Sequence, residues 1–219
     1  MNRPLLAALL CLLAAPARAD EGMWTFDNIP EDQLFERHGF IPDAAWLEHA
    51  RLASLRFNDG GSGSFVSPEG LVLTNHHVAL GQLQKMSTPE RDYVKAGFFA
   101  RTRGQESPCP DLELNQLVSY EDVTSRVLSG LPKGVPQAQV NDARRAAVAG
   151  VEKECSDKGG LRCDVVELYQ GGEYWLYRYK KYTDIRLVMT PEVDAAFFGG
   201  DPDNFVFPRY DLDFAFFRV

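Results

Sequence analysis

Two adjacent histidines in Gly-Leu-Val-Leu-Thr-Asn-His-His-Val, residues 70–78, are candidates for acid–base chemistry. The pKa of imidazole lies near neutrality, so a histidine at the end of a rigid strand is suited to act as a general base. A histidine considered alone is more often a packed or surface residue. The residue types do not choose between His76 and His77, and either needs a partner to act.

Asp213 is the candidate partner, within Asp-Leu-Asp-Phe-Ala-Phe-Phe, residues 211–217. A carboxylate inside an otherwise apolar strand is costly unless it is paired. A histidine ring nitrogen is a natural partner, because the carboxylate fixes the tautomer and stabilises the imidazolium during catalysis. The alternative is an aspartate at a strand edge that points to water.

Short β-prone segments must position these residues. Phe65–Ser67 and Leu71–Thr74 flank the turn signal Pro68-Glu69-Gly70, which predicts a hairpin that presents Asn75-His76-His77 at its end. Further strands are expected at residues 164–169 and 173–182 around Gly171-Gly172, at the alternating Ile185, Leu187 and Met189, and within Leu212–Val219. The fold class is therefore mainly β.

Two helical stretches accompany the strands. Residues 23–58 are predicted to be helical, with Trp46, Ala50, Ala53 and Phe57 packed on one buried face. A second helix is expected to begin at Pro136 and to run to Cys155. We expect it to belong to a helical insertion at about residues 85–160.

Composition excludes several classes of protein. The 219 residues, 45% hydrophobic and 25% charged, suit a globular chain with a real core. The net charge of −8 argues against a nucleic-acid binder, which needs a clustered basic face. No Cys-x-x-Cys or paired histidine spacing supports a structural zinc site, and we expect no cofactor.

The N-terminus resembles an export signal. A basic start, the apolar run Leu5–Ala15 and the small residues Ala17 and Ala19 predict a secretory signal peptide over residues 1–19. We therefore expect an exported protein, periplasmic or attached to the cell surface in a Gram-negative bacterium, with no membrane span. Export permits disulfides, and the turn-rich stretch between Cys155 and Cys163 favours a bridge there, which leaves Cys109 without an expected partner.

The segment Gly61–Val66 followed by Gly70–Val78 resembles the first barrel of trypsin-like serine peptidases, including the Htr-type proteases. The run Phe-Gly-Gly-Asp-Pro-Asp-Asn-Phe-Val-Phe-Pro-Arg-Tyr-Asp-Leu-Asp, residues 198–213, strongly resembles the bacterial dipeptidyl-peptidase 7 and dipeptidyl-peptidase 11 family of serine exopeptidases. Gly22-Met23-Trp24 fits the same family, so the resemblance covers residues 22–219.

This resemblance implies a trypsin-like double β-barrel with an added helical domain, of which the chain supplies the first barrel. It makes His77 the base and Asp213 the residue that orients it. Asn204 would bind the α-ammonium group of a peptide substrate, beside Phe205, which stands where the family often has tryptophan. Val78 replaces a cysteine often found after the histidine pair, which puts a family disulfide at that point in doubt.

The nucleophilic serine of the family lies in the second barrel, and neither Ser62 nor Ser64 suits that role. We therefore expect an N-terminal portion that is inactive alone and has the C-terminal part of the enzyme as partner, with a homodimer of the full-length protein left open. Two alternatives remain: a non-catalytic barrel that binds peptides, and an Htr-type endopeptidase. A Gly-x-Ser-Gly-type segment encoded beyond Val219 would exclude the first.

Overall fold

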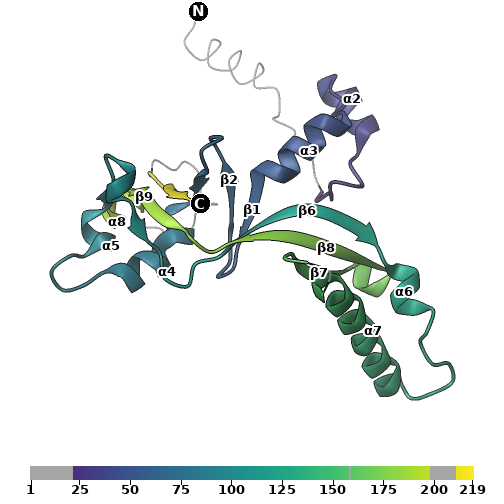
Figure 1. The fold of residues 1–219 in the computed structure, drawn as a ribbon. Coiled ribbons are helices and arrows are strands. Elements are labelled where there is room, and N and C mark those ends of the chain that lie inside the picture. The colour runs from purple at the N-terminus through teal and green to yellow at the C-terminus, as the bar shows by residue number, and fades with distance from the viewer. Residues whose placement is uncertain (1–21, 158, 198–210) are drawn as a thin grey trace, which may run out of the picture. The chain divides into compact units, whose positions relative to one another are not determined.

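The computed structural model describes residues 22–157, 159–197 and 211–219, and the chain divides into two compact units at Asp43/Ala44 (Figure 1). In the N-terminal unit, helix α2 spans Glu31–His38. Glu31 and Asp32 lie in its first turn and basic residues in its last, which suits the helix dipole. Gly39, with φ of 64°, ends it in the left-handed conformation that glycine adopts readily.

Antiparallel strands of the second unit form a ring. Strands β1 (Ser54–Phe57), β2 (Ser62–Phe65), β3 (Leu71–Thr74), β10 (Ala215–Arg218) and β9 (Arg186–Thr190) pair in that order. Among the described residues, one segment borders both ends of this row. It pairs with β9 through β5 (Ser107–Pro108) and with β1 through β6 (Leu114–Asp122).

The inside of this ring holds the main core. Alternate side chains of its strands are buried, including Phe57, Val72, Leu187 and Phe217. The rings of Phe57 and Phe217 meet edge to face with centroids 5.9 Å apart. An outer strand, β4 (Phe98–Phe99), pairs with β9. The sheet is antiparallel throughout, which confirms a mainly β fold.

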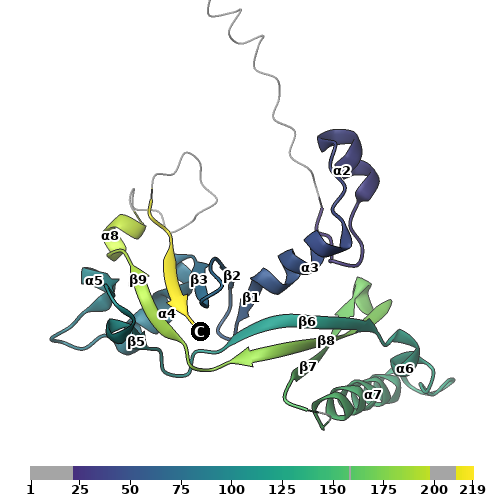
Figure 2. The same ribbon diagram turned by 45° about the horizontal axis from the view of Figure 1, so that its top comes forward.

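A long ribbon continues from the ring. Strand β6 pairs along most of its length with β8 (Glu173–Tyr182), which in turn pairs with β7 (Arg162–Leu168). Helices α6 (Thr124–Leu128) and α7 (Gln137–Asp157) pack on this ribbon around a second core (Figures 1 and 2). The predicted β7–β8 hairpin at Gly171-Gly172, the strand through Leu187 and Met189, and the helix from Pro136 are confirmed.

The predicted helix over residues 23–58 was wrong in its extent. The structure has α2, a separate α3 (Ala44–Ala53) and then β1. Trp46 is 51% exposed, so the predicted buried stripe does not exist, whereas Phe57 is buried as a strand residue paired with β6. Cross-strand pairing overrides the helical spacing at this point.

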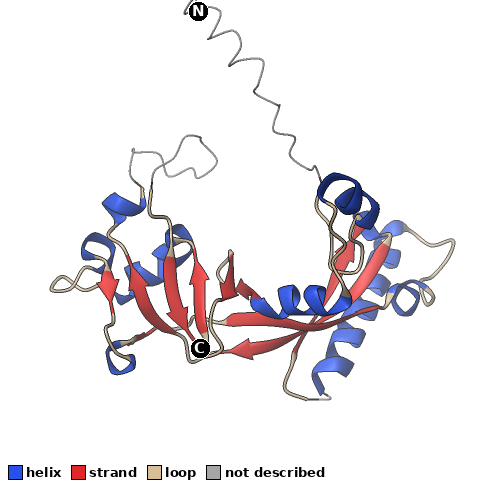
Figure 3. Cartoon of the chain, turned by 90° about the horizontal axis from the view of Figure 1, so that it is seen from above, coloured by secondary structure: helices blue, strands red, loops and turns tan. Residues whose placement is uncertain are grey.

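The described chain contains both helices and strands (Figure 3), and the region at about residues 85–160 is likewise mixed rather than helical. It contains the end of α4 (His76–Met86), α5 (Tyr93–Ala96), α6 and α7, but also β4, β5 and β6. In the part of the chain that the structure describes, no helix is long and apolar enough to cross a membrane.

Candidate active site

Pairing between β3 and β10 brings His77 and Asp213 together across 136 residues of sequence. Thr74, the last residue of β3, lies opposite Ala215, the first residue of β10, in an antiparallel pair. The residues that follow β3 and those that precede β10 therefore meet at the same end of these two neighbouring strands. His77 lies there in the first turn of α4, and Asp213 precedes β10 by two positions.

The two side chains form a hydrogen-bonded pair. His77 Nδ1 lies 2.8 Å from Asp213 Oδ2, and the backbone N–H of His77 donates to Asp213 Oδ1 at 3.0 Å. An ionised carboxylate accepts only, so it holds the proton of neutral imidazole on Nδ1 and leaves the lone pair on Nε2. The carboxylate is 9% exposed and the imidazole 40%, so the pair presents the ring to solvent and shields the acid behind it.

Asn75 contributes to the same site and had no predicted role. Its Nδ2 donates to both Oδ2 and the backbone oxygen of Asp213, each at 3.1 Å. The amide thus fixes the carboxylate and the start of β10 together. The signal in the sequence was its place between the strand end Thr74 and the histidines, but sequence gives no sign of which residue it contacts.

These hydrogen bonds set the charge of Asp213. Burial raises the pKa of the carboxyl, but the His77 backbone N–H, the His77 ring and Asn75 outweigh it and hold the pKa below its ordinary value. Asp213 is therefore ionised at neutral pH. An ionised carboxylate beside Nδ1 orients an imidazole and stabilises the imidazolium that forms when Nε2 accepts a proton.

His76 differs from His77 in its exposure to solvent. It is fully buried, and its ring meets Phe197 edge to face with centroids 5.6 Å apart. Burial lowers its pKa, against the opposing effect of Asp213, so the ring is neutral. Within the described residues, neither ring nitrogen has a partner with good hydrogen-bond geometry, although the backbone of Pro191 lies close enough to oppose the lowering of the pKa. A buried ring cannot meet a substrate, so of these two histidines only His77 is open to one.

Ser62 and Ser64 make other hydrogen bonds in strand β2. The carbonyl of Ser62 accepts from the Thr74 hydroxyl, and the Ser64 hydroxyl donates to the carbonyl of Phe65. Of the other predicted residues, Asn204 and Phe205 lie outside the described residues. The described residues hold no group of three or more His, Cys, Asp and Glu side chains that could bind a metal.

The three described cysteines form one disulfide and one free thiol. Cys155 and Cys163 form a disulfide that ties the last turn of α7 to the start of β7. Cys109 is a buried free thiol, and burial raises its pKa to about 12. Such a thiol is almost entirely protonated at neutral pH and is a poor nucleophile.

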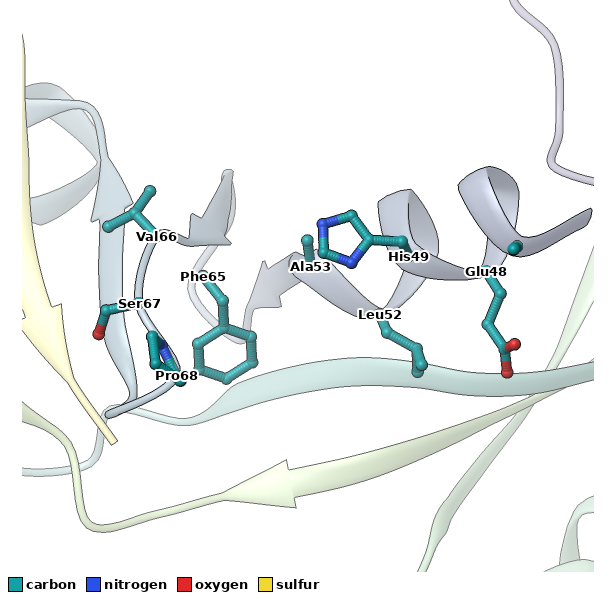
Figure 4. Close-up of a pocket in the computed structure, with 9 residues that line it drawn as sticks. Glu48, His49, Leu52, Ala53, Phe65, Val66, Ser67 and Pro68 are labelled. Atoms are coloured by element: carbon teal, nitrogen blue, oxygen red, sulfur yellow. The ribbon is translucent and has the colours of Figure 1, made fainter. Parts of the chain in front are cut away.

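A groove of about 700 Å³ lies between α3 and the turn after β2. In Figure 4, Leu52 and Ala53 line it from the helix, and Phe65 and Pro68 line it from the other wall. Neither His77 nor Asp213 lines this groove. It is therefore a separate feature from the hydrogen-bonded pair.

The sequence profile described as Peptidase S46 matches residues 19–219. The chain belongs to the peptidase S46 family. It is 35% identical to Dipeptidyl-peptidase 7 of Capnocytophaga gingivalis over 98% of this chain and 31% of that protein. It is 36% identical to the Asp/Glu-specific dipeptidyl-peptidase of Shewanella putrefaciens over 98% of this chain and 30% of that protein.

Solved structures give the same relation. The chain superposes on Porphyromonas endodontalis DPP11, crystallised in complex with the dipeptide Arg-Glu, with a TM-score of 0.75 and 29% identity. The match covers 92% of this chain and 30% of that one. The S46 fold is thus shared, and the chain spans about a third of the length of these relatives.

Proposed function

We propose that this chain supplies the base and the orienting carboxylate of a serine-type peptidase that releases dipeptides from the free N-termini of peptides. The observation that carries this proposal is the 2.8 Å contact between His77 Nδ1 and Asp213 Oδ2, with the ring partly open to solvent. The family membership and the names of the relatives support the dipeptidyl-peptidase assignment.

The geometry suits a two-step acyl transfer. His77 Nε2 takes the proton from a serine hydroxyl as the hydroxyl oxygen attacks the carbonyl carbon of the second peptide bond. Asp213 stabilises the imidazolium that forms, and His77 then gives this proton to the leaving amine. Water, deprotonated by His77, hydrolyses the acyl-enzyme in the second step.

The serine is proposed to come from a region that corresponds to the part of the relatives outside the match to this chain. The 219 residues alone are proposed to be inactive. A non-catalytic, peptide-binding role is the rival function. The close base–acid contact disfavours it, because binding a peptide does not require an ionised acid behind an imidazole. An Htr-type endopeptidase would share the pair but would also cleave peptides with blocked N-termini.

Free N-termini are proposed to bind at Asn204 and Phe205, by the resemblance described above. Export to the periplasm after removal of residues 1–19 is also proposed, and sequencing the N-terminus of the periplasmic protein tests it. A mature start far from residue 20, or retention in the cytoplasm, would contradict that proposal.

The test of function uses His77→Ala in the protein as its gene encodes it, with turnover of a fluorogenic dipeptidyl substrate as the measurement. We expect a loss of about 10³–10⁴-fold or more, as for removal of other triad members. His49→Ala, at an exposed histidine outside the site, is the matched control and should retain activity.

His76→Phe separates the two adjacent histidines. It keeps an aromatic ring against Phe197 and removes two buried nitrogens that lack a well-formed hydrogen bond, so the free energy of unfolding should stay level or rise by about 1 kcal/mol. Activity should survive within about tenfold. Loss of activity in His76→Phe with retention in His77→Ala would reverse the assignment.

A further inference from the structure

Asn75 stands at the N-cap position of helix α4 but its side chain does not cap the helix. Its backbone is extended, with φ of −82° and ψ of 153°, and its carbonyl accepts from the N–H of Ala79. The side-chain oxygen of an asparagine at an N-cap ordinarily accepts from the N–H of the second or third residue of the helix. In the described part of the chain, the side chain of Asn75 makes no such bond.

The cap of α4 comes from Asp213 instead. His77 is the second residue of the helix, and its backbone N–H donates to Asp213 Oδ1 at 3.0 Å. The partly positive N-terminus of a helix favours a carboxylate at this place. The same carboxylate faces the His77 ring through Oδ2. One residue, 136 positions further along the chain, therefore caps the helix and orients the imidazole.

The amide of Asn75 is turned toward this carboxylate. Its Nδ2 donates to Asp213 Oδ2 and to the backbone oxygen of Asp213, each at 3.1 Å. An NH₂ group has two N–H donors, which is one for each acceptor. Since the acceptors lie on the side chain and the backbone of one residue, holding both fixes the side-chain torsions of Asp213. The outer torsion of an aspartate is otherwise broad, and rotation about it would carry Oδ2 away from Nδ1.

This contact explains the type of residue at position 75. Serine or aspartate would cap a helix as well as asparagine does. A serine side chain is too short to reach both acceptors of Asp213, and an ionised aspartate has no donor and repels a second carboxylate. An asparagine amide supplies both donors at the required length.

We propose that Asn75 is a positioning residue of the reaction, which holds Asp213 Oδ2 against His77 Nδ1 and leaves the capping of α4 to Asp213. The inference rests on the proposed function, in which His77 is the base and Asp213 orients it. Without the amide, the His77 ring is the one donor that Oδ2 keeps among the described contacts. A smaller fraction of molecules then holds the imidazole in the reactive orientation, so the effect falls on the chemical step and not on substrate binding.

Two substitutions separate positioning from capping. Asn75→Ala removes both the amide and any capping group, whereas Asn75→Ser supplies a capping hydroxyl without restoring the contact with Asp213. Asn141→Ser is the matched control, since Asn141 lies on α7 and its side-chain oxygen accepts from Gln137. The measurements are steady-state release of dipeptides by the protein as its gene encodes it, and the midpoint of thermal unfolding, Tm.

We expect both Asn75 variants to lose about 10–100-fold in kcat, with KM within about twofold of the wild-type value. The control should keep kcat within about twofold, and Tm of Asn75→Ser should be no lower than that of Asn75→Ala. If kcat of Asn75→Ser returned to within about twofold of wild type, Asn75 would serve the helix alone. If KM rose with kcat unchanged, Asn75 would contact the substrate. Either result overturns the proposal.

A crystal structure of Asn75→Ser gives a measurement that does not depend on activity. We expect the Asp213 carboxylate in more than one conformer, and a single conformer with Nδ1 and Oδ2 still 2.8 Å apart would overturn the positioning role. A wild-type protein that releases no dipeptides overturns the proposed function alone, since the conformers of Asp213 still test Asn75. An active wild type with unchanged kinetics in Asn75→Ser overturns the role of Asn75 alone.

Discussion

Replacing Asp213 by asparagine tests whether the carboxylate orients His77, and it changes the shape of the side chain very little. Three donors converge on this carboxylate: the His77 backbone N–H, the His77 ring and the Asn75 amide. A carboxylate accepts all three, but an asparagine offers one oxygen and one NH₂ group. If its oxygen keeps the backbone N–H of His77, its NH₂ faces both Nδ1 and the NH₂ of Asn75.

The imidazole must then accept at Nδ1, which moves its proton to Nε2 and removes the base. We expect kcat to fall about 10³–10⁴-fold, or about 4–5.5 kcal/mol at 1.36 kcal/mol for each tenfold step, with little change in KM. The new NH₂ group at position 213 also removes one of the two acceptors of the Asn75 amide and leaves it the backbone oxygen. Asn75→Ala in the same background should therefore cost less than it does in the wild type.

The assay is steady-state hydrolysis of a dipeptidyl substrate by the gene-encoded protein. Asp184→Asn is the matched control, because Asp184 is an exposed aspartate that pairs with Arg186. The control should retain activity within about twofold. A loss of less than about tenfold in Asp213→Asn, in a folded protein, would refute the role given to the carboxylate.

Further predictions concern stability. Gly61→Ala should lower the free energy of unfolding by more than about 1 kcal/mol in chemical denaturation, because φ of Gly61 is +90° and the new Cβ would lie 2.6 Å from the side chain of Val78. Gly81→Ala, with nothing within 4 Å, should stabilise α4 by up to about 1 kcal/mol, and equal effects would refute the steric argument. Replacing Cys155 and Cys163 by serine should lower the unfolding free energy by about 2–3 kcal/mol, and dithiothreitol should then have no further effect on it. The lowered pKa of Asp213 stabilises the fold fully above its unfolded pKa near 4, and this contribution is lost as the pH falls through the folded pKa. The stability difference between wild type and Asp213→Asn should thus be constant above about pH 5 and shrink below pH 4, and a difference that grows in acid would contradict this sign.

Local signals in the sequence predicted the residues of the site better than they predicted the strands and helices around it. The hairpin before His77 was identified because a turn signal separates two short β-prone runs, although its first strand is Ser62–Phe65 rather than the predicted Phe65–Ser67. Asp213 stood out as a charge in an apolar run, but its predicted place inside the strand was wrong, since β10 begins two residues later at Ala215. Their contact depends on pairing between β3 and β10, which no local pattern encodes.

The missed elements are those that distant partners create. Strand β6 was not predicted, since Leu-Asn-Gln-Leu-Val-Ser-Tyr-Glu-Asp alternates poorly, and its β structure comes from pairing with β8 and β1. Phe57 fitted a helical spacing but is a buried strand residue that pairs with Leu114 of β6 and packs against Phe217 of β10. Asn75 was in view, but its acceptor lies 138 residues away.

Cys109 directly follows β5, in the segment that pairs with β9 through β5 and with β1 through β6 and so closes the ring. Its backbone N–H donates to Ile185, and its thiol is buried with a pKa of about 12. Both barriers to alkylation vanish when that segment detaches, because a solvated thiol has a pKa near 8.5. The rate at which a thiol reagent alkylates Cys109 would therefore report how often the ring of strands opens.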